Sequence, residues 1–278
     1  MNHSSNAYAL ISGASQGLGK ALALELASRS CNLLLVSLKN EGLEALSAQI
    51  RREFGVDVQY FEADFCEQNA VYDIASWARE KFPVFMLVNN AGIGGTKAFE
   101  KASPEYMDRI IQVNVRASTL LTRLMLPALR QHPRAYILNV SSMASFSPLP
   151  FKTVYPASKA FISVFSQSLK AELRNSNVKV SVIHPGPVPT NPDVKARIAR
   201  LGRLGRMGLL SPERLARLSI DRLLNGQFRL IPGLMNKVNR FLLAMVPDVL
   251  KLPLLCRLMQ RELGEQSFHI QSKPLNLN

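Results

Sequence analysis

Cysteine is scarce in this chain of 278 residues, and its three copies, Cys31, Cys66 and Cys256, lie far apart. An odd number of scattered cysteines is a poor basis for a disulfide framework, and no CxxC pair offers the ligand spacing of a zinc site. We therefore expect no disulfide, no bound metal and a reducing, cytoplasmic setting.

Long apolar runs are also missing. A membrane-spanning helix needs about 18 or more uninterrupted apolar residues. The nearest candidate, residues 241–256, is interrupted by Pro247, Asp248, Lys251 and Pro253. The first residues form a short polar leader without the basic region, apolar stretch and cleavage site of a signal peptide. We expect a chain that is neither exported nor anchored by a spanning helix.

Acidic residues are few beside the basic ones. There are 34 Lys and Arg against 20 Asp and Glu, a formal charge of +14. Such a field attracts nucleic acid, acidic lipid or acidic protein over about 10 Å. The stretch from Lys195 to Asn278 holds 15 basic and 5 acidic side chains and therefore most of this excess. Its basic residues alternate with aliphatic ones and few aromatics, which disfavours nucleic acid as a partner.

What the sequence does contain, up to about residue 190, is a regular alternation of short apolar runs with amphipathic stretches. This is the pattern of βαβ units around a parallel sheet. We expect strands at 7–11, 33–36, 56–61, 84–88, 135–140 and 178–183, and helices at 18–28, 41–54, 67–81, from 103 past 121, and at 155–173. The fold class is then α/β, a Rossmann-like doubly wound sheet with helices on both faces.

The composition changes after residue 190. Residues 194–210 are rich in Arg, Leu and Gly, and Ser211-Pro212 is typical of a helix start. A helix at 215–224 and a strand at 227–231 should complete a single domain over 1–231. Residues 232–278 should form a basic, amphipathic extension of helices broken by prolines, with a frayed tail after about Gly264.

A glycine-rich turn, with the sequence SGASQGLG, follows the first strand and opens the first helix. Glycines at Gly13, Gly17 and Gly19 permit a tight turn and let the backbone approach a pyrophosphate at the positive end of the helix. The spacing is Gly-x3-Gly-x-Gly, and an ordinary turn is the alternative for this feature alone. Its place between strand and helix favours a dinucleotide site.

The end of the second strand bears on which dinucleotide binds. An NAD site usually has an acidic residue there for the ribose 2′-hydroxyl. Residues 26–40 contain no Asp or Glu and offer Ser37, Leu38 and Lys39 instead. This neutral and basic corner favours NADP(H) over NAD(H). The alternative for Lys39 alone is that it is a solvent-exposed residue of an ordinary turn.

The pair Tyr155-x3-Lys159 places a phenol and an ammonium on one face of a helix. The ammonium would lower the phenol pKa from about 10, so that the phenol can exchange a proton with a carbonyl or alcohol. Two further polar residues accompany the pair: Ser142 follows the strand at 135–140, and Asn114 lies within a predicted helix. Each of them alone would also suit a structural role.

Taken together, these motifs resemble those of the classical short-chain dehydrogenases/reductases. The family pattern is Thr-Gly-x3-Gly-x-Gly, Asn-Asn-Ala-Gly, a helix Asn, a Ser, Tyr-x3-Lys and Pro-Gly-x-Val-x-Thr, and the chain matches each in order, with Ser12 in place of Thr. The resemblance covers about residues 7–231. It implies that Tyr155 exchanges the proton, Ser142 orients the carbonyl, Lys159 binds the nicotinamide ribose, and Asn114 supports a water-linked relay.

The resemblance also implies most of the cofactor contacts. NADP-preferring members usually carry Arg where this chain has Leu38, which leaves Lys39 as the phosphate partner. The expected contacts are Gly13, Ser15, Gly17, Leu18, Gly19, Ser37, Lys39, Asp64, Asn90, Ala91, Gly92, Tyr155, Lys159, Pro185, Gly186, Val188 and Thr190.

The expected function is NADP(H)-dependent interconversion of a carbonyl and a secondary alcohol on a lipid-like substrate, either a 3-oxoacyl thioester or a ketosteroid-like molecule. In this family the residues corresponding to 191–210 form a substrate lid, which is basic here. That lid favours an acyl chain carried by coenzyme A or acyl carrier protein, or a substrate at an anionic membrane surface. The alternative is that its basic residues lie on solvated faces of ordinary helices. A catalytically silent dinucleotide sensor or scaffold is the alternative, and the resemblance suggests a homodimer or homotetramer.

Overall fold

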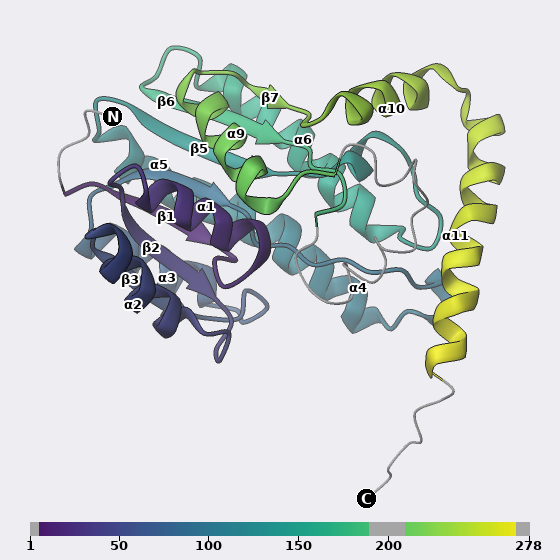
Figure 1. Cartoon of the computed structure of the whole chain (residues 1–278), viewed down its shortest axis with the longest axis horizontal. Coiled ribbons are helices and arrows are strands. Elements are labelled where there is room, and N and C mark those ends of the chain that lie inside the picture. The colour runs from purple at the N-terminus through teal and green to yellow at the C-terminus, as the bar shows by residue number, and fades with distance from the viewer. Residues whose placement is uncertain (1–5, 189–208, 271–278) are drawn as a thin grey trace, which may run out of the picture.

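The computed structural model describes residues 6–188 and 209–270, with side chains up to residue 260. Figure 1 shows a twisted sheet between two layers of helices. Its seven strands pair in parallel in the order β3-β2-β1-β4-β5-β6-β7. They are β1 (Tyr8–Ser12), β2 (Asn32–Ser37), β3 (Val58–Glu62), β4 (Val84–Asn89), β5 (Ala135–Val140), β6 (Val178–Ile183) and β7 (Arg229–Leu230). The predicted doubly wound fold is confirmed.

Two apolar cores bind the helices to the two faces of the sheet. One core holds α1 (Gly17–Ala27), α2 (Leu43–Phe54) and α9 (Pro212–Leu224) through residues such as Leu22 and Ile220. The other holds α3 (Ala70–Lys81) and α5 (Ser118–Arg130) through residues such as Ile74 and Met125. The helix α6 (Val154–Glu172) packs on the same side as α5, against β6 and β5. Amphipathic helices on both faces are what a fully buried parallel sheet requires.

The expected helix from residue 103 past 121 is not one regular helix. It consists of α4 (Pro104–Ile111), a π-helical segment η2 (Gln112–Ala117) and α5. Ser103 caps α4 by accepting a hydrogen bond from the Tyr106 amide. A π segment carries one extra residue per turn and is frequent at functional sites. Here it contains Asn114, whose side chain bonds the backbone of Ile93 rather than its own helix.

The C-terminal helices differ from expectation in two respects. Pro247 separates α10 (Leu234–Met245) from α11 (Asp248–Ile270), but Pro253 lies inside α11, and α11 continues beyond the predicted end near Gly264. Pro253 lies close to the start of α11, and the carbonyl left without its hydrogen-bond donor belongs to Val249, a residue that is 82% exposed. Water can therefore satisfy that carbonyl. The predicted strand at 227–231 shrinks to the two residues of β7.

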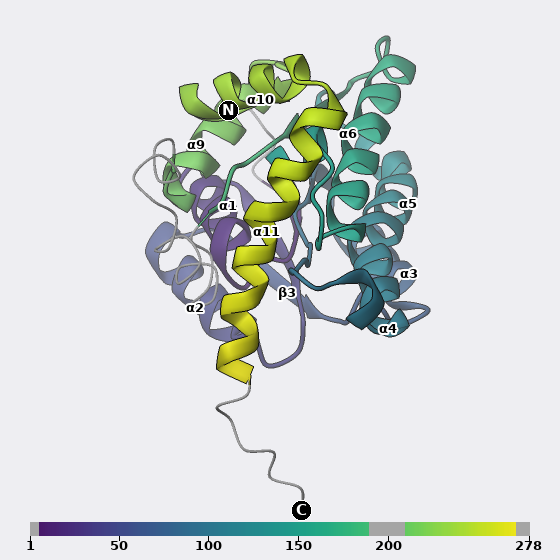
Figure 2. The same ribbon diagram turned by 90° about the vertical axis from the view of Figure 1, so that its right-hand side faces the viewer.

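The helices α10 and α11 lie beyond the ends at which the strands finish (Figure 1), and α11 crosses in front of that end of the molecule in Figure 2. None of the helices within 6–188 and 209–270 is both long and apolar enough to cross a membrane. The strand order reverses between β1 and β4, and the crevice outside the carboxyl ends at such a reversal is where open α/β sheets bind ligands.

Candidate active site

The glycine turn after β1 lies against the segment that follows β4. Gly13 has a φ of +66°, and a Cβ added to it would lie 2.8 Å from the Cα of Ala91. A Cβ at Gly19 would lie 1.9 Å from the carbonyl oxygen of Gly13. No side chain fits at either position, because the turn packs closely against Ala91 and against the amino end of α1. This arrangement fits a pyrophosphate, which needs close backbone approach and the positive end of a helix.

The Asn-Asn-Ala-Gly segment holds this turn in place. The Ser12 hydroxyl accepts hydrogen bonds from the amides of Asn90 and Ala91, each at 3.1 Å. In return the Asn90 amide group donates to the carbonyls of Ser12 and Gly13 at 3.0 and 2.9 Å. The hydroxyl at position 12 is what this network uses, and serine supplies it as well as threonine would.

Asn89 and Asn139 tie the layers together below the site. Buried Asn89 donates from Nδ2 to Thr122 Oγ1 and Asn139 Oδ1, both at 2.8 Å. Asn139 Nδ2 in turn donates to Ser166 Oγ at 2.9 Å. These amides brace β4, β5, α5 and α6 and carry a structural role.

At the end of β2, Ser37 Oγ donates to Ser15 Oγ at 2.8 Å, which joins two predicted cofactor residues across the glycine turn. Leu38 and Lys39 lie next along the chain and are both exposed. The register between β2 and β3 also sets Glu62 beside Ser37. This carboxylate comes from the neighbouring strand, so a search of the residues after β2 could not have found it.

Asp64, the predicted adenine contact, lies just after β3. Its Oδ1 accepts from the Cys66 amide at 2.9 Å, and its Oδ2 pairs with Arg109 of α4 at 3.2 Å. Both carboxylate oxygens of Asp64 are thus engaged, which fixes the loop after β3.

Lys159 lies inside the protein, with 5% of its surface exposed. Its Nζ donates to the carbonyl of Val140 at 3.0 Å, and Ser141 Oγ donates to the Lys159 carbonyl at 2.7 Å. Burial lowers the pKa of the ammonium to about 8, because an apolar environment disfavours the charged form. A buried cation with a pKa near the working range is typical of a functional site.

Asn114 and Lys159 both lie close to the Gly92 backbone. A Cβ on Gly92 would lie 2.9 Å from Lys159 Nζ and 3.3 Å from Asn114 Oδ1. Asn114 Oδ1 accepts from the Ile93 amide, while its Nδ2 donates to the Ile93 carbonyl and to Ser158 Oγ, all at 2.9 Å. The structure therefore brings these two predicted residues together over the Gly92 backbone.

Tyr155 lies in the first turn of α6, where the loop after β4 confines its ring. A Cβ on Gly94 would lie 2.5 Å from Cδ2 of this ring. Ser158 Oγ donates to the Tyr155 carbonyl at 2.7 Å and accepts from Asn114, so it links the π segment to the turn that carries Tyr155. The sequence motifs did not single out Gly94 or Ser158, because a Gly and a Ser in such places are common.

Ser142 follows β5 and caps the short helix η3 (Met143–Phe146), where its Oγ accepts from the Ala144 amide at 3.1 Å. The Pro185 carbonyl accepts from the Met143 amide at 2.8 Å, which joins the serine loop to the Pro-Gly segment. Val188 packs against the core. Thr190 and nearly all of the predicted lid, residues 191–208, lie outside the described residues.

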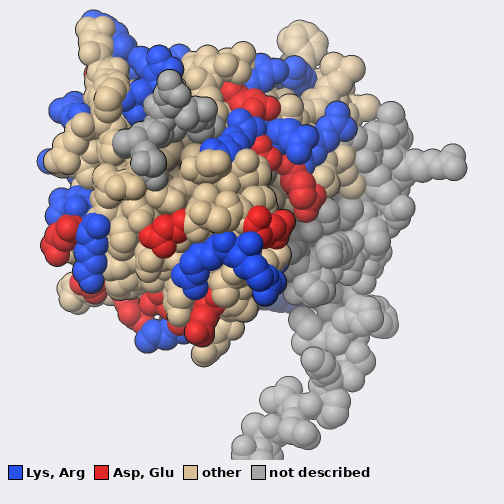
Figure 3. Space-filling view, turned by 60° about the vertical axis from the view of Figure 1, so that its left-hand side comes forward, with Lys and Arg blue, Asp and Glu red and all other residues tan. Residues whose placement is uncertain are grey.

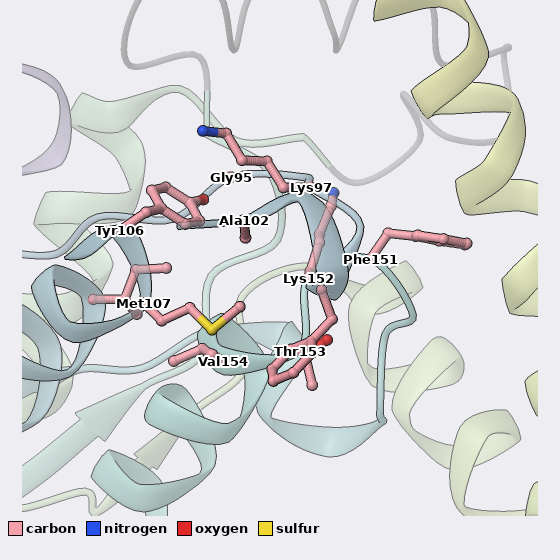
Figure 4. A pocket seen from close by; sticks show the side chains of 11 residues that line it. Gly95, Lys97, Ala102, Tyr106, Met107, Phe151, Lys152, Thr153 and Val154 are labelled. Atoms are coloured by element: carbon pink, nitrogen blue, oxygen red, sulfur yellow. The ribbon is translucent and has the colours of Figure 1, made fainter. Parts of the chain in front are cut away.

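A small hollow is formed by the loop after β4, the start of α4 and the residues at and just before the start of α6 (Figure 4). Lys97 Nζ lies 4.6 Å above the ring of Tyr106, and the Tyr106 hydroxyl is buried without a hydrogen-bond partner among the described residues. The lining residues are Gly95, Lys97, Phe99, Ala102, Tyr106, Met107, Ile110, Phe151, Lys152, Thr153 and Val154. The volume of this hollow is about 20 Å³, far below the roughly 300 Å³ or more of a ligand pocket, and its lining includes none of the predicted catalytic residues.

Comparison with known proteins gives one family match and many relatives. A family model described as short chain dehydrogenase matches residues 7–200. The chain is 35% identical over 189 residues to a very-long-chain 3-oxoacyl-CoA reductase of Anas platyrhynchos, covering 64% of this chain and 59% of that protein. It is 34% identical over 188 residues to human 17-beta-hydroxysteroid dehydrogenase type 3, covering 66% and 59%. The match thus spans about three fifths of these relatives.

Solved structures match over more of the chain. A structure from work on 7beta-hydroxysteroid dehydrogenase stereoselectivity has a TM-score of 0.76 at 26% identity and covers 84% of this chain and 90% of its own. A short-chain dehydrogenase from Sphingobium yanoikuyae in complex with NADPH has a TM-score of 0.74 at 25% identity, with 98% of each chain covered.

Proposed function

The chain belongs to the short-chain dehydrogenase/reductase family, and from this membership we propose that it is an NADP(H)-dependent oxidoreductase that interconverts a carbonyl and a secondary alcohol. The observation that carries the proposal is the buried Lys159 ammonium, four residues after Tyr155 on α6 and next to Asn114 over Gly92. We assign residues 1–231 to the catalytic domain and 232–278 to an extension.

In the proposed mechanism the nicotinamide, when bound, supplies or accepts the hydride. Tyr155 gives a proton to the carbonyl oxygen during reduction, or takes one from the alcohol during oxidation. Ser142 hydrogen-bonds the same oxygen and orients it. Lys159 holds the nicotinamide ribose and, as a nearby cation, favours the ionised form of Tyr155. Asn114 keeps the backbone at Ile93 in place and sustains the proton relay toward Lys159.

The remaining predicted contacts would hold the cofactor. The turn with Gly13, Gly17, Leu18 and Gly19 would bind the pyrophosphate, and the segments Asn90–Gly92 and Pro185–Thr190 would bind the nicotinamide side. Asp64 would contact the adenine, and Ser15, Ser37 and Lys39 would hold the adenosine 2′-phosphate.

The preference for NADP(H) is supported by the hydroxyls of Ser15 and Ser37, which are 2.8 Å apart, and by Lys39 beside them. An NADPH complex among the similar structures agrees with it. Glu62, which is acidic, flanks the same corner. The preference for NADP(H) should therefore come from the positive charge of Lys39. Hydride transfer measured with both cofactors should favour NADPH, and Lys39→Ala should reduce that preference about tenfold while sparing NADH. A clear preference for NADH in the unaltered protein would contradict this assignment.

For the substrate we propose a lipid-like carbonyl compound, a 3-oxoacyl thioester or a ketosteroid-like molecule. The names of two relatives support these two classes. NADPH oxidation should be followed with simple ketones, sugars, 3-oxoacyl thioesters and ketosteroids. Activity confined to simple ketones or sugars would contradict the proposed class.

We further propose a cytoplasmic protein that forms a dimer or tetramer through α5 and α6, where Phe161 and Val164 expose apolar surface. Its thioester would arrive on coenzyme A or acyl carrier protein, or its lipid from an anionic membrane surface.

A silent dinucleotide sensor is the second candidate function, but such proteins usually lack the Tyr or Lys that this chain retains.

A further inference from the structure

The two C-terminal helices expose an unusual number of large apolar side chains. Soluble monomers rarely present large contiguous apolar patches, and those that exist usually mark an interaction site. We call the set on α10, α11 and their junction the C-terminal apolar surface. It consists of Leu234, Val238, Phe241, Leu242, Met245, Val246, Val249, Leu250, Leu254 and Leu258, which are between 39% and 82% exposed.

Helical spacing gathers these side chains on one side of each helix. In α10 they recur every three to four residues from Leu234 to Met245. In α11 Leu250, Leu254 and Leu258 recur every four residues, which places them on one stripe. A second stripe on α11, which includes Leu252, Leu255 and Met259, is partly buried. Because the second stripe is the one that is partly covered, the stripe of Leu250, Leu254 and Leu258 remains available to contact a partner outside the described residues.

The charges around the C-terminal apolar surface are almost all positive. Lys237 and Arg257 are exposed, whereas half-buried Arg240 lies over the ring of Phe146 on the other side of α10. Asp248 is the acidic residue between 232 and 260, and Lys251 pairs with it at 2.7 Å. Figure 3 shows a different situation on the face of the sheet domain that it presents, where red and blue side chains are interspersed. The apolar surface therefore has a basic border, and residues 1–231 also carry a positive excess, with 28 Lys and Arg against 17 Asp and Glu.

We propose that the C-terminal apolar surface docks on an anionic lipid bilayer, with α10 and α11 lying in the interface. Amphipathic helices with Leu and Phe on one side and basic residues beside them bind in this way. A second copy of the chain is disfavoured as the occupant, because pairing two such surfaces brings their basic borders together in a protein of net charge +14. An anionic bilayer attracts the same border.

The side of α10 opposite its exposed apolar stripe contacts the proposed active site. A Cβ on Gly186 of the Pro-Gly segment would lie 3.1 Å from the Asn236 amide group of α10. The Arg240 guanidinium lies 4.9 Å above the ring of Phe146, in the short helix that Ser142 caps. Docking would thus hold the proposed active site behind α10, close to the lipid. This last step rests on the proposed function, whereas docking itself does not.

Vesicle flotation of the full chain tests docking without substrate or cofactor. The protein should float with vesicles of phosphatidylcholine and phosphatidylglycerol, and much less with phosphatidylcholine alone or at high salt. The double variant Met245→Glu/Leu250→Glu should bind at least about tenfold more weakly, since both side chains should enter the interface. The matched control is Tyr72→Glu on α3, whose exposed side chain lies outside the surface and whose binding should equal that of the unaltered protein.

Hydrogen exchange of the unaltered protein gives a reading that needs no variant: residues 234–258 should become protected when anionic vesicles are added. Three results would overturn the proposal. The first is no flotation with anionic vesicles, and the second is equal binding by the double variant. The third is a double variant that turns an oligomer into a monomer when the unaltered protein does not float, which would identify a second copy as the occupant. Loss of oxidoreductase activity would leave all these readings unaffected.

Discussion

At the scale of single residues, the motif positions were predictable because each carries a distinctive chemistry. The structure places Asn114 and Lys159 together over Gly92, and it sets the ring of Tyr155 against Gly94. The residues that connect them were not predictable. Ser158 matters because it bonds both Asn114 and the Tyr155 carbonyl, and such a link depends on how two helices meet rather than on residue type.

Burial of Lys159 makes the stability of the protein without cofactor depend on pH. Burial lowers the pKa of this ammonium from 10.5 to about 8, so the unfolded chain binds the proton more tightly than the folded one. The penalty is full below pH 8, and the free energy of unfolding should rise as the pH increases from about 8 toward 10.5. Each pKa unit corresponds to about 1.4 kcal/mol.

Lys159→Met should remove this rise and stabilise the cofactor-free protein at pH 7 by about 1–3 kcal/mol, while abolishing turnover. Urea unfolding of both proteins across this pH range measures the effect, and the difference between the two curves separates Lys159 from other titrating groups. A variant with the same pH dependence as the unaltered protein would show that this ammonium is not desolvated.

At the scale of elements, periodicity predicted the six longer strands and the helices around them to within a few residues, because burial on a parallel sheet leaves a strong apolar pattern. Three features escaped it. The π segment η2 has the same composition as a regular helix, and its register is set by the bonds of Asn114 to Ile93. Pro253 is tolerated at an exposed place in α11, and the β2–β3 register alone brings Glu62 to Ser37.

The loop after β4 should position Tyr155, and Gly94→Ala tests this role. The added methyl meets the tyrosine ring 2.5 Å away, so the ring must shift. We expect kcat to fall at least about tenfold, with little change in the KM for NADPH and little loss of stability, because a small misplacement of a catalytic group is costly.

Gly42→Ala is the contrasting control. Gly42 has a φ of +75° and open space around it. That variant should lose about 1 kcal/mol of stability and keep its kcat. Equal kcat values for Gly94→Ala and the unaltered enzyme would remove Gly94 from the positioning of Tyr155.

At the scale of the whole molecule, the charge of +14 separates into two parts. Residues 1–231 carry +11, with 28 Lys and Arg against 17 Asp and Glu, and residues 232–278 carry +3, with 6 against 3. The extension combines a basic border with the C-terminal apolar surface. Net charge alone could not distinguish nucleic acid from lipid as the partner, whereas the exposed apolar stripes of α10 and α11 favour lipid.

Tyr155 should exchange the proton in an NADP(H)-dependent reduction, and the variant Tyr155→Phe tests this role. NADPH oxidation with the best substrate of the screen should fall by at least about 100-fold, because the proton donor is lost. NADPH binding, followed by the fluorescence of the cofactor, should remain within a few-fold. Turnover that survives unchanged in a variant that still binds NADPH would contradict the account.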